Sequence, residues 1–286
     1  NRSGSIRRAV GDGETSSPGD DVLQDILHLV RQRTGHNFFH YKKNTIIRRI
    51  EKRILVNNVD SPEAYYELLK EKVNEASLLL KDLLIGVTSF FRDPDAFTMV
   101  REKVIPDIFK DKRPDEPVRI WSAGCSTGEE AYSLAILIAD YLRHTRRSFT
   151  VQIFATDVDK ESIERARAGL YPQNIAADLP PEFLKTYFKQ IDDYYQVAPQ
   201  IREMLIFASH DVLSDPPFFK LDLIVCRNLL IYLTSDVQKK LLPIFFYSLK
   251  PGGYLFLGSS ETIGTYSEMF LCQDKKWKIF KKNELV

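Results

Sequence analysis

The chain has 286 residues, of which 44% are hydrophobic, and its formal net charge is +1. The length suits one large or two modest domains, and the nearly neutral charge argues against a general nucleic-acid-binding protein, which needs a basic excess. No apolar run reaches the roughly 18 residues that a membrane span requires. The three cysteines, Cys125, Cys226 and Cys272, are too widely spaced for a zinc site or a disulfide framework, so we expect no metal and a reducing, cytoplasmic setting.

Residues 1–20 are rich in glycine, serine and aspartate and show no apolar periodicity, so we expect a disordered linker. Residues 21–114 carry apolar side chains at helical spacing, which predicts an all-helical N-terminal domain. Its helices are expected to begin near Asp21, Asn44, Ser61, Asn74 and Asp93. The last of them should run through Phe109.

The second of these helices, residues 44–57, has an apolar and a basic face. Its inward-facing side chains are expected to be Ile46, Ile47, Ile50, Ile54 and Leu55. Its other positions are mostly basic: Lys42, Lys43, Arg48, Arg49, Lys52 and Arg53, against one acid, Glu51. This basic face fits either a solvated surface or a docking site for an acidic partner.

The segment between the fourth and fifth helices mixes apolar and polar residues. Gly86, Thr88 and Arg92 interrupt an apolar stretch, and two phenylalanines, Phe90 and Phe91, stand beside the arginine. The pattern fits either a lid or hinge between domains or a helix junction with a surface arginine. A charged, proline-containing linker then leads into a second domain, residues 115–286.

Residues 118–142 organise the rest of the chain. A short apolar run predicts a buried strand, a small-residue turn holds Gly124 and Gly128, and apolar residues at helical spacing follow from Glu129. Strand, glycine turn and helix form the opening unit of a nucleotide-binding α/β sheet. Because glycine lets the backbone approach a ligand closely, Gly124 is a candidate cofactor contact.

Two acids, Glu129 and Glu130, stand where a pyrophosphate would bind in the phosphate-binding versions of this unit. They would repel phosphate, so the ligand should be uncharged or cationic near the turn. S-adenosylmethionine fits, because it carries an ammonium and a sulfonium but no phosphate. The alternative is that both acids merely complement the helix dipole.

A second strand, residues 151–156, ends at Asp157. An acid at this position binds the ribose hydroxyls in such sheets, because a carboxylate accepts hydrogen bonds from both of them. Asp157 could instead cap the helix predicted at residues 160–168. Since Asp159 is available as the cap, we favour the ribose role.

Residues 169–204 are too long for an ordinary connection, so we expect an inserted β subdomain with a hairpin of residues 194–197 and 200–204. The remaining strands are expected at residues 205–209, 221–226 and 254–257, with a last antiparallel strand at 276–281. Ligands of open α/β sheets bind beyond the carboxyl ends of the strands. Arg227, Asn228 and Tyr232 follow such an end and are further site candidates.

Five motifs occur in a fixed order along the chain. They are TSFFRDP at residues 88–94, WSAGCSTGEEAYS at 121–133, ATDVD at 155–159, CRN-x-x-x-Y at 226–232 and LKPGGYLFLGSSE at 249–261. Together they resemble the motifs of the chemotaxis receptor glutamate O-methyltransferases, the CheR family. The resemblance implies an all-α N-terminal domain followed by a class I methyltransferase, Rossmann-like α/β sheet with an inserted small β subdomain.

The resemblance also implies a cofactor, S-adenosylmethionine, with S-adenosylhomocysteine as the product. Glu129 would hold its methionine amine and Asp157 its ribose, while Thr88 and Arg92 would contact it from the connecting segment. The rest of the pocket would be lined by Asp211, Val212, Arg227 and Asn228. Many relatives have Asn where this chain has Gly86, so a side-chain contact is lost there.

The implied partner is the cytoplasmic helical domain of a chemoreceptor. Its acidic methylation helices would face the basic side chains Lys43, Arg48, Arg49, Lys52 and Arg53. Residues 190–202 look short for docking a receptor's C-terminal peptide. The sequence around residues 84–93 is similar to that of family members fused to a CheB-type methylesterase and sensor modules. We therefore expect the chain to be a monomeric piece of a longer protein.

The implied reaction needs no general base, because a glutamate side chain is already ionised at neutral pH and a sulfonium methyl group is an activated electrophile. The enzyme must align the reacting atoms and exclude water, and Arg92, Arg227 or Tyr232 could hold the incoming carboxylate. One rival interpretation is a non-catalytic module that binds S-adenosylmethionine and signals to partners. Another is a nucleic-acid methyltransferase, but the DPPF motif at residues 215–218 precedes a strand instead of following it.

Overall fold

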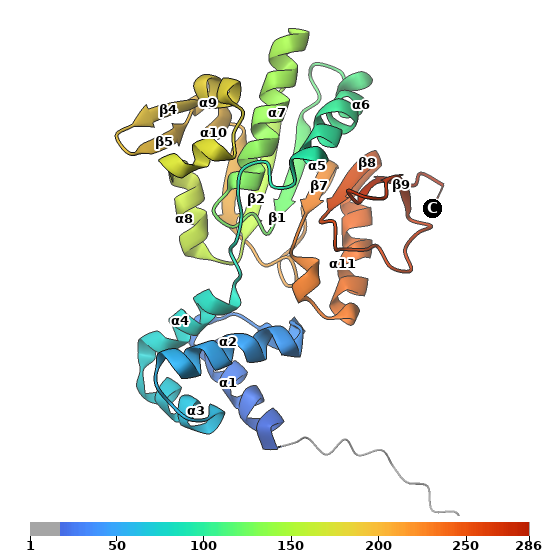
Figure 1. Cartoon of the computed structure of the whole chain (residues 1–286). Coiled ribbons are helices and arrows are strands. Elements are labelled where there is room, and N and C mark those ends of the chain that lie inside the picture. The colour runs from blue at the N-terminus through green and yellow to red at the C-terminus, as the bar shows by residue number, and fades with distance from the viewer. Residues whose placement is uncertain (1–17, 286) are drawn as a thin grey trace, which may run out of the picture. The chain divides into compact units, whose positions relative to one another are not determined.

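The computed structural model describes residues 18–285 and divides the chain into two compact units, Asn1–Leu83 and Leu84–Val286 (Figure 1). The linker predicted at residues 1–20 lies outside the described residues except for its last three, which begin the first helix. The domain boundary predicted at residue 114 is corrected to Leu83. Residues 84–114 belong to the second unit because Phe97, Val100 and Phe109 are buried in its core.

The first unit is all helical, as predicted. Its elements are α1 (Pro18–Thr34), the 3-10 helix Phe38–His40, α2 (Lys43–Val56), α3 (Pro62–Glu71) and α4 (Val73–Leu83). Helix α1 packs against α3 and α4, and α2 packs against α4. The core between them is formed by the fully buried side chains of Ile26, Val30, Leu69, Ala76 and Leu79.

A buried carboxylate, Glu75 of α4, ties three helices of this unit together. It accepts two hydrogen bonds from the Arg53 guanidinium and one from the Tyr65 hydroxyl, each at 2.8 Å. Burial alone would raise the pKa of Glu75, but the hydrogen bonds from Arg53 and Tyr65 outweigh it, so the pKa is lowered. Arg53 is therefore bound within the unit, which corrects its assignment to the partner-binding face.

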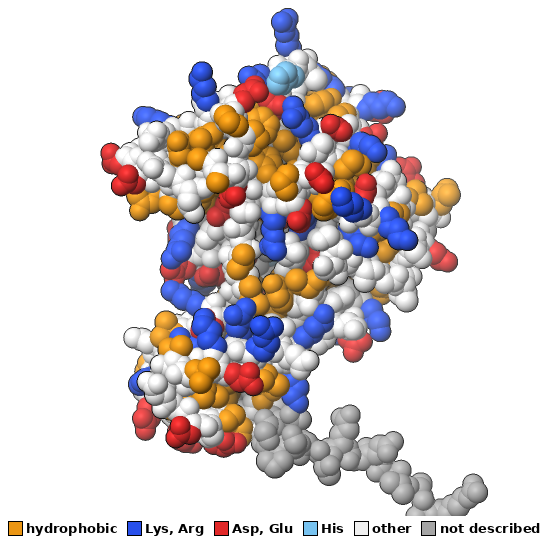
Figure 2. Space-filling view, in the orientation of Figure 1, with side chains coloured by type: hydrophobic (Ala, Val, Ile, Leu, Met, Phe, Trp, Pro, Cys, Tyr) orange, Lys and Arg blue, Asp and Glu red, His pale blue; other side chains and the backbone are white. Residues whose placement is uncertain are grey.

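The face of helix α2 that packs on the core includes only some of the isoleucine and leucine side chains that were expected there. Ile46 and Ile50 are buried, but Leu55 is 76% exposed, so its predicted inward position is wrong. At about 100° per residue, Leu55 stands about 180° around the helix from Ile46, whereas Arg53 stands only about 20° away. Figure 2 shows Lys and Arg side chains gathered over α2.

The second unit is built on a 7-stranded sheet. In spatial order its strands are β6 (Leu205–Ser209), β2 (Val151–Asp157), β1 (Val118–Ala123), β7 (Leu221–Cys226), β8 (Leu249–Leu257), β10 (Ile279–Lys282) and β9 (Phe270–Asp274). The first five run parallel, β10 pairs antiparallel with β8, and β9 pairs antiparallel with β10. The sequence did not predict β9, because most of its side chains are exposed and it lacks an apolar alternation.

Strand β1 shows how helices cover both faces of this sheet. Ile120 points into the core shared with α7 (Glu129–Thr145). Its neighbour Trp121 packs against Phe245 of α11 (Ser235–Ser248), with ring centroids 5.8 Å apart. Successive side chains of a strand point to opposite faces, so the two helices lie on opposite sides, as expected for this fold class.

The other helices of the second unit differ from the prediction in one place. Helix α8 (Lys160–Ala168) packs on β2 and β6. The single helix expected from residue 93 to 109 consists of α5 (Pro94–Met99), a π-helical turn (Val100–Val104) and α6 (Ile105–Lys110). Pro106 lacks an amide hydrogen and its ring would collide with the carbonyl four residues back. Just before Pro106 the backbone hydrogen bonds reach five residues back instead of four, as the Ile105 N–H donates to the Val100 carbonyl.

The inserted subdomain carries a small sheet, as predicted, but with a different pairing. Its strands, in spatial order, are β3 (Leu170–Pro172), β5 (Tyr194–Val197) and β4 (Phe188–Ile191). The 3-10 helix Gln173–Ala177, α9 (Pro181–Tyr187) and α10 (Pro199–Arg202) complete it. The hairpin arm expected at residues 200–204 is wrong, since Pro199 occupies the first position of a helix, where its missing N–H costs nothing.

Candidate functional site

The carboxyl ends of five parallel strands meet at one edge of the large sheet. From β1 the chain builds outward to β2 and β6 on one side, and later to β7 and β8 on the other. Such a reversal of strand order next to β1 leaves a crevice at the strand ends, where ligands bind in open α/β sheets. The predicted site residues follow these ends: Gly124 and Glu129 after β1, Asp157 at the end of β2, Asp211 and Val212 after β6, and Arg227, Asn228 and Tyr232 after β7.

The glycine turn after β1 folds back onto the end of β2. The N–H groups of Gly124 and Cys125 both donate to the Thr156 carbonyl oxygen, at 2.8 and 2.9 Å. Gly128 has a φ of +97°, and a β-carbon there would lie 2.8 Å from the Ala166 β-carbon. Gly128 is therefore required by backbone conformation and packing, while Gly124 holds the turn at the strand edge.

Three carboxyl groups gather where this turn meets α7: those of Glu129, Glu130 and Asp157. Burial is the largest influence on each and raises the pKa of all three. The Thr127 hydroxyl donates a hydrogen bond to Glu129 at 2.7 Å, and the Ser126 N–H donates to Asp157 at 2.8 Å. A cation at this edge would favour the ionised carboxylates, whereas a phosphate would be repelled by them.

Asp157 is placed to accept further hydrogen bonds. Its Oδ2 accepts one from Ser126 and its Oδ1 accepts one from the Asp159 N–H at 2.9 Å. The Val158 N–H also contributes, but with two lone pairs on each carboxylate oxygen the group can still accept from a ligand. Asp159 caps α8 by accepting from the Glu161 N–H at 3.0 Å, which confirms that Asp157 is not needed as the cap.

The segment before α5 lies against the glycine turn. The Ser126 hydroxyl donates to the Gly86 carbonyl at 3.3 Å. A β-carbon on Gly86 would lie 3.0 Å from that hydroxyl oxygen, so Ser126 occupies the space beside Gly86. The Arg92 guanidinium donates to the Val87 carbonyl at 2.9 Å, and both Arg92 and Thr88 are half-buried residues. Both predicted contacts are thus carried by a segment that touches the turn.

The two phenylalanines of this segment are core residues. Phe90 contacts Tyr171 edge-on with centroids 5.0 Å apart, and Phe91 contacts Phe97 at 5.4 Å. Phe90 is 2% exposed and Phe91 7%. The rings therefore anchor the segment inside the second unit.

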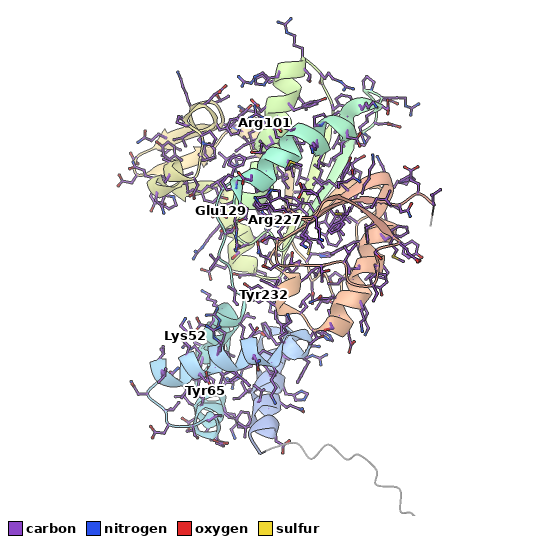
Figure 3. The ribbon with its side chains drawn as sticks, turned by 45° about the vertical axis from the view of Figure 1, so that its right-hand side comes forward. Lys52, Tyr65, Arg101, Glu129, Arg227 and Tyr232 are labelled. Carbon is purple, nitrogen blue, oxygen red and sulfur yellow. The ribbon has the colours of Figure 1, made fainter. Side chains whose placement is uncertain are left out.

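Arg227 lies behind the crevice, among buried groups. Its Nη1 donates to the Glu130 carboxylate at 3.2 Å and to the Arg92 carbonyl at 3.1 Å, and its Nη2 pairs with Asp93 at 2.5 Å. The guanidinium lies 4.7 Å from the centre of the Phe256 ring, and its side chain is 1% exposed. This corrects its assignment to the substrate carboxylate, because the charged end is paired and closed to solvent. Figure 3 labels Arg227 and Glu129 beside α7.

One carboxylate, Glu261, holds the loops that follow β7 and β8. It accepts hydrogen bonds from the N–H groups of Gly258 at 2.6 Å, Leu230 at 2.7 Å and Asn228 at 3.1 Å. It is 4% exposed. Glu261 ends the LKPGGYLFLGSSE motif, and the sequence alone assigned it no role. Its signal was an acid surrounded by small and apolar residues just after a buried strand.

The remaining predicted residues lie on these loops. Tyr232 ends the 3-10 helix Leu230–Tyr232 and is half-buried (Figure 3). Asp211 and Val212 are half-buried after β6, and the Asp211 carboxylate accepts from the Leu213 N–H at 2.9 Å. The structure thus brings every predicted cofactor contact to one edge of the sheet except the Arg227 side chain.

A cavity of about 320 Å³ lies beside α7. Its lining includes Phe91, Pro94, Phe97, Arg101, Leu137, Asp178, Leu179 and Phe183. Within residues 18–285, no group of three or more His, Cys, Asp or Glu side chains is arranged to bind a metal ion. In the same part of the chain, none of the helices combines the length and apolar composition needed to cross a membrane.

Two sequence models of one family match adjoining parts of the chain. The model described as CheR methyltransferase, SAM binding domain, matches residues 86–279, and that described as CheR methyltransferase, all-alpha domain, matches residues 21–84. These matches correspond to the two units of the structure. They bear out the fold class and the cofactor, S-adenosylmethionine, that the sequence predicted.

Individual relatives agree with the family models. A chemotaxis protein methyltransferase of Borreliella burgdorferi is 32% identical over 85% of this chain and 88% of its own length. A putative methyltransferase, Cher3, of Pseudomonas putida is 31% identical over 94% of this chain and 100% of its own length. An uncharacterized 104.1 kDa protein of Rhodobacter capsulatus is 41% identical over 96% of this chain, which spans only 29% of that protein. A solved TehB-like SAM-dependent methyltransferase of Corynebacterium glutamicum is 15% identical over 67% of this chain and 96% of that one, and its TM-score of 0.34 is too low to carry an argument.

Proposed function

The chain belongs to the CheR methyltransferase family, and from this membership we propose that it methylates glutamate carboxylates of chemoreceptors. The methyl group of S-adenosylmethionine would pass to a side-chain carboxylate oxygen in a receptor's cytoplasmic helical domain and form a methyl ester. The family supports methylation in chemotaxis. The receptor glutamates, the cytoplasmic setting and the residue roles below are our proposal.

The carboxyl cluster at the N-terminus of α7 is the observation that carries this proposal. Glu129 is the group for the methionine ammonium, and Asp157 has lone pairs left for the ribose hydroxyls. A buried anionic edge favours a cationic ligand over a phosphorylated one. S-adenosylmethionine supplies an activated methyl group on a sulfonium, and the chain's own residues need only bind, orient and exclude water.

The substrate carboxylate requires a donor but no base, since it is ionised at neutral pH. Arg92 is the candidate donor, because the residue is half-buried and its guanidinium makes one hydrogen bond, at 2.9 Å, to the Val87 carbonyl. Its remaining N–H groups can bind a carboxylate. Tyr232, half-buried on the loop after β7, is the second candidate. Either group would align the attacking oxygen with the methyl carbon.

The basic face of α2 is the proposed contact for the receptor. Lys43, Arg48 and Lys52 are exposed and Arg49 is half-buried, while Arg53 is withdrawn to Glu75. Lys52 also pairs with Asp82. The exposed Leu55 stands on the same side of the helix as Arg48. An acidic amphipathic helix would complement this mixture of charge and apolar surface.

Transfer of labelled methyl groups to a receptor's cytoplasmic fragment tests the proposal. We expect label on the fragment that is released by mild alkali, because carboxyl methyl esters hydrolyse there. Alkali-stable label, or label on nucleic acid, would rule out the ester. Binding of S-adenosylhomocysteine without transfer to any receptor fragment would instead favour a non-catalytic module.

A further inference from the structure

The short turn formed by Phe91, Arg92 and Asp93 has a strained backbone. Phe91 has a φ of +50° and Asp93 a φ of +62°. Left-handed conformations are tolerated by aspartate but are unfavourable for a bulky aromatic residue, and they persist only where the surroundings hold them. Arg92, the proposed cofactor and substrate contact, lies between these two residues. Its orientation therefore depends on whatever keeps the turn in place.

Two groups on different elements hold this turn. On one side, the Ser133 hydroxyl of α7 accepts a hydrogen bond from the Phe91 N–H at 2.9 Å. On the other side, Arg227 donates to the Arg92 carbonyl at 3.1 Å and pairs with the Asp93 carboxylate at 2.5 Å. Arg227 thus binds the backbone of one turn residue and the side chain of the next. Its planar fork of donors suits this double contact, which a lysine cannot reproduce.

Arg227 is itself held firmly. Its guanidinium pairs with the buried Glu130 at 3.2 Å and lies over the rings of Phe97, at 5.5 Å, and Phe256, at 4.7 Å. Phe91 and Phe97 also line the cavity of about 320 Å³. The turn therefore borders a cavity, and the contacts of Arg227 add to the restraint that the packing of Phe91 against Phe97 and Phe183 provides.

We propose that Arg227 is a positioning residue for methyl transfer. It touches neither cofactor nor substrate through its side chain. It fixes the turn of residues 91–93 against the sheet, so that the Arg92 guanidinium faces the crevice beside the carboxyl cluster. The inference rests on the proposed function, in which Arg92 contacts the cofactor, and it explains why a buried arginine with both terminal nitrogens paired stands immediately after the central strand β7.

Asp93→Asn is the cleanest test, because asparagine tolerates the left-handed conformation and Asp93 lies near the surface, with a side chain 38% exposed. The change removes the ion pair with Arg227 and leaves Arg227 bound to Glu130. We expect S-adenosylhomocysteine to bind on the order of tenfold more weakly by calorimetry, since small misplacements of a positioned group carry such costs. Asp95→Asn is the matched control, because Asp95 is exposed and its ion pair is with the exposed Lys276, at 3.6 Å. Its affinity should equal that of the unmodified chain.

Combining these changes with Arg92→Ala separates positioning from general damage. If Arg227 acts through Arg92, Asp93→Asn will weaken binding in the unmodified chain and have no further effect in Arg92→Ala. Arg227→Lys should weaken binding as Asp93→Asn does, and the double variant of residues 93 and 227 should be no weaker than either single one. Equal losses in both Arg92 backgrounds, or full affinity in Asp93→Asn, would overturn the inference. Full affinity in Arg92→Ala would also overturn it, yet would leave intact the methyl-transfer proposal, which labelled receptor tests separately.

Discussion

Glu261→Gln should destabilise the second unit more than any other isosteric change at the crevice. One carboxylate oxygen accepts from Gly258 at 2.6 Å and Asn228 at 3.1 Å, and the other from Leu230 at 2.7 Å and Ile231 at 3.4 Å. A glutamine must place its NH₂ group where one of these oxygens stands. Whichever way it turns, two N–H groups lose their acceptor and face a donor.

The size of the effect follows from those two lost acceptors. A buried, unsatisfied N–H costs about 1–3 kcal/mol, which gives roughly 2–6 kcal/mol for the pair. Burial raises the pKa of Glu261, so neutralising the side chain recovers some desolvation energy, and we expect a loss of about 2–4 kcal/mol in the free energy of unfolding. That is a large share of the roughly 5–15 kcal/mol by which domains are stable.

Urea unfolding of both proteins measures this loss directly. Glu268→Gln is the matched control, because Glu268 is exposed on the same segment, and it should stay within about 0.5 kcal/mol of the unmodified chain. A Glu261→Gln protein as stable as the control would show that the two loops do not depend on this carboxylate.

Three further changes test other parts of the structure. Gly128→Ala should cost roughly 2–4 kcal/mol of unfolding free energy, because of the +97° φ and the 2.8 Å approach to Ala166; thermal unfolding with little change would contradict the packing described for the turn. Arg48→Glu should slow methylation of a receptor fragment about tenfold at low salt while leaving the affinity for S-adenosylhomocysteine unchanged. Its control is Lys72→Glu, which changes an exposed residue outside α2. Equal effects of the two substitutions on methylation would argue against a specific basic face. The pKa of Glu75 is lowered in the folded state, so its ionised form stabilises the first unit above the unfolded pKa of about 4.3, and this stabilisation is lost as the pH falls through the lower folded pKa. Glu75→Gln should therefore lower the stability at neutral pH and make the stability depend less on pH in the acid range. An unchanged dependence of stability on acid pH would show that another group is responsible.

The parts of the fold that sequence predicted are those specified by local patterns. The strand, glycine turn and helix around Gly124 and Glu129 were predicted because a short apolar run, two glycines and helical spacing follow one another within a few residues. The hairpin in the inserted subdomain was predicted with the wrong partner because β4 and β5 are short and their pairing is decided by tertiary contacts. Pro199 indicated a helix at this place, because proline is common at the first position of a helix.

The roles of charged residues were harder to predict, because they depend on partners far away in sequence. Arg53 and Arg48 look alike along α2, yet only Arg53 stands beside Ile46 on the helical wheel, where it meets Glu75 of α4. Arg227 follows a strand end, which correctly placed it near the crevice. Nothing in the sequence showed that Asp93 and Glu130 would enclose its charge.

The central claim is that the edge formed by Glu129 and Asp157 accepts a cationic methyl donor and rejects polyphosphates. Calorimetric titration with S-adenosylmethionine and, separately, with ATP compares two ligands that share adenosine and differ in the charge attached to it. We expect saturable binding of S-adenosylmethionine, weakened by Glu129→Gln, and no measurable heat with ATP. If the unmodified chain bound ATP as tightly as S-adenosylmethionine, the edge would not reject polyphosphates. The same would follow if Glu129→Gln bound ATP more tightly than the unmodified chain binds S-adenosylmethionine.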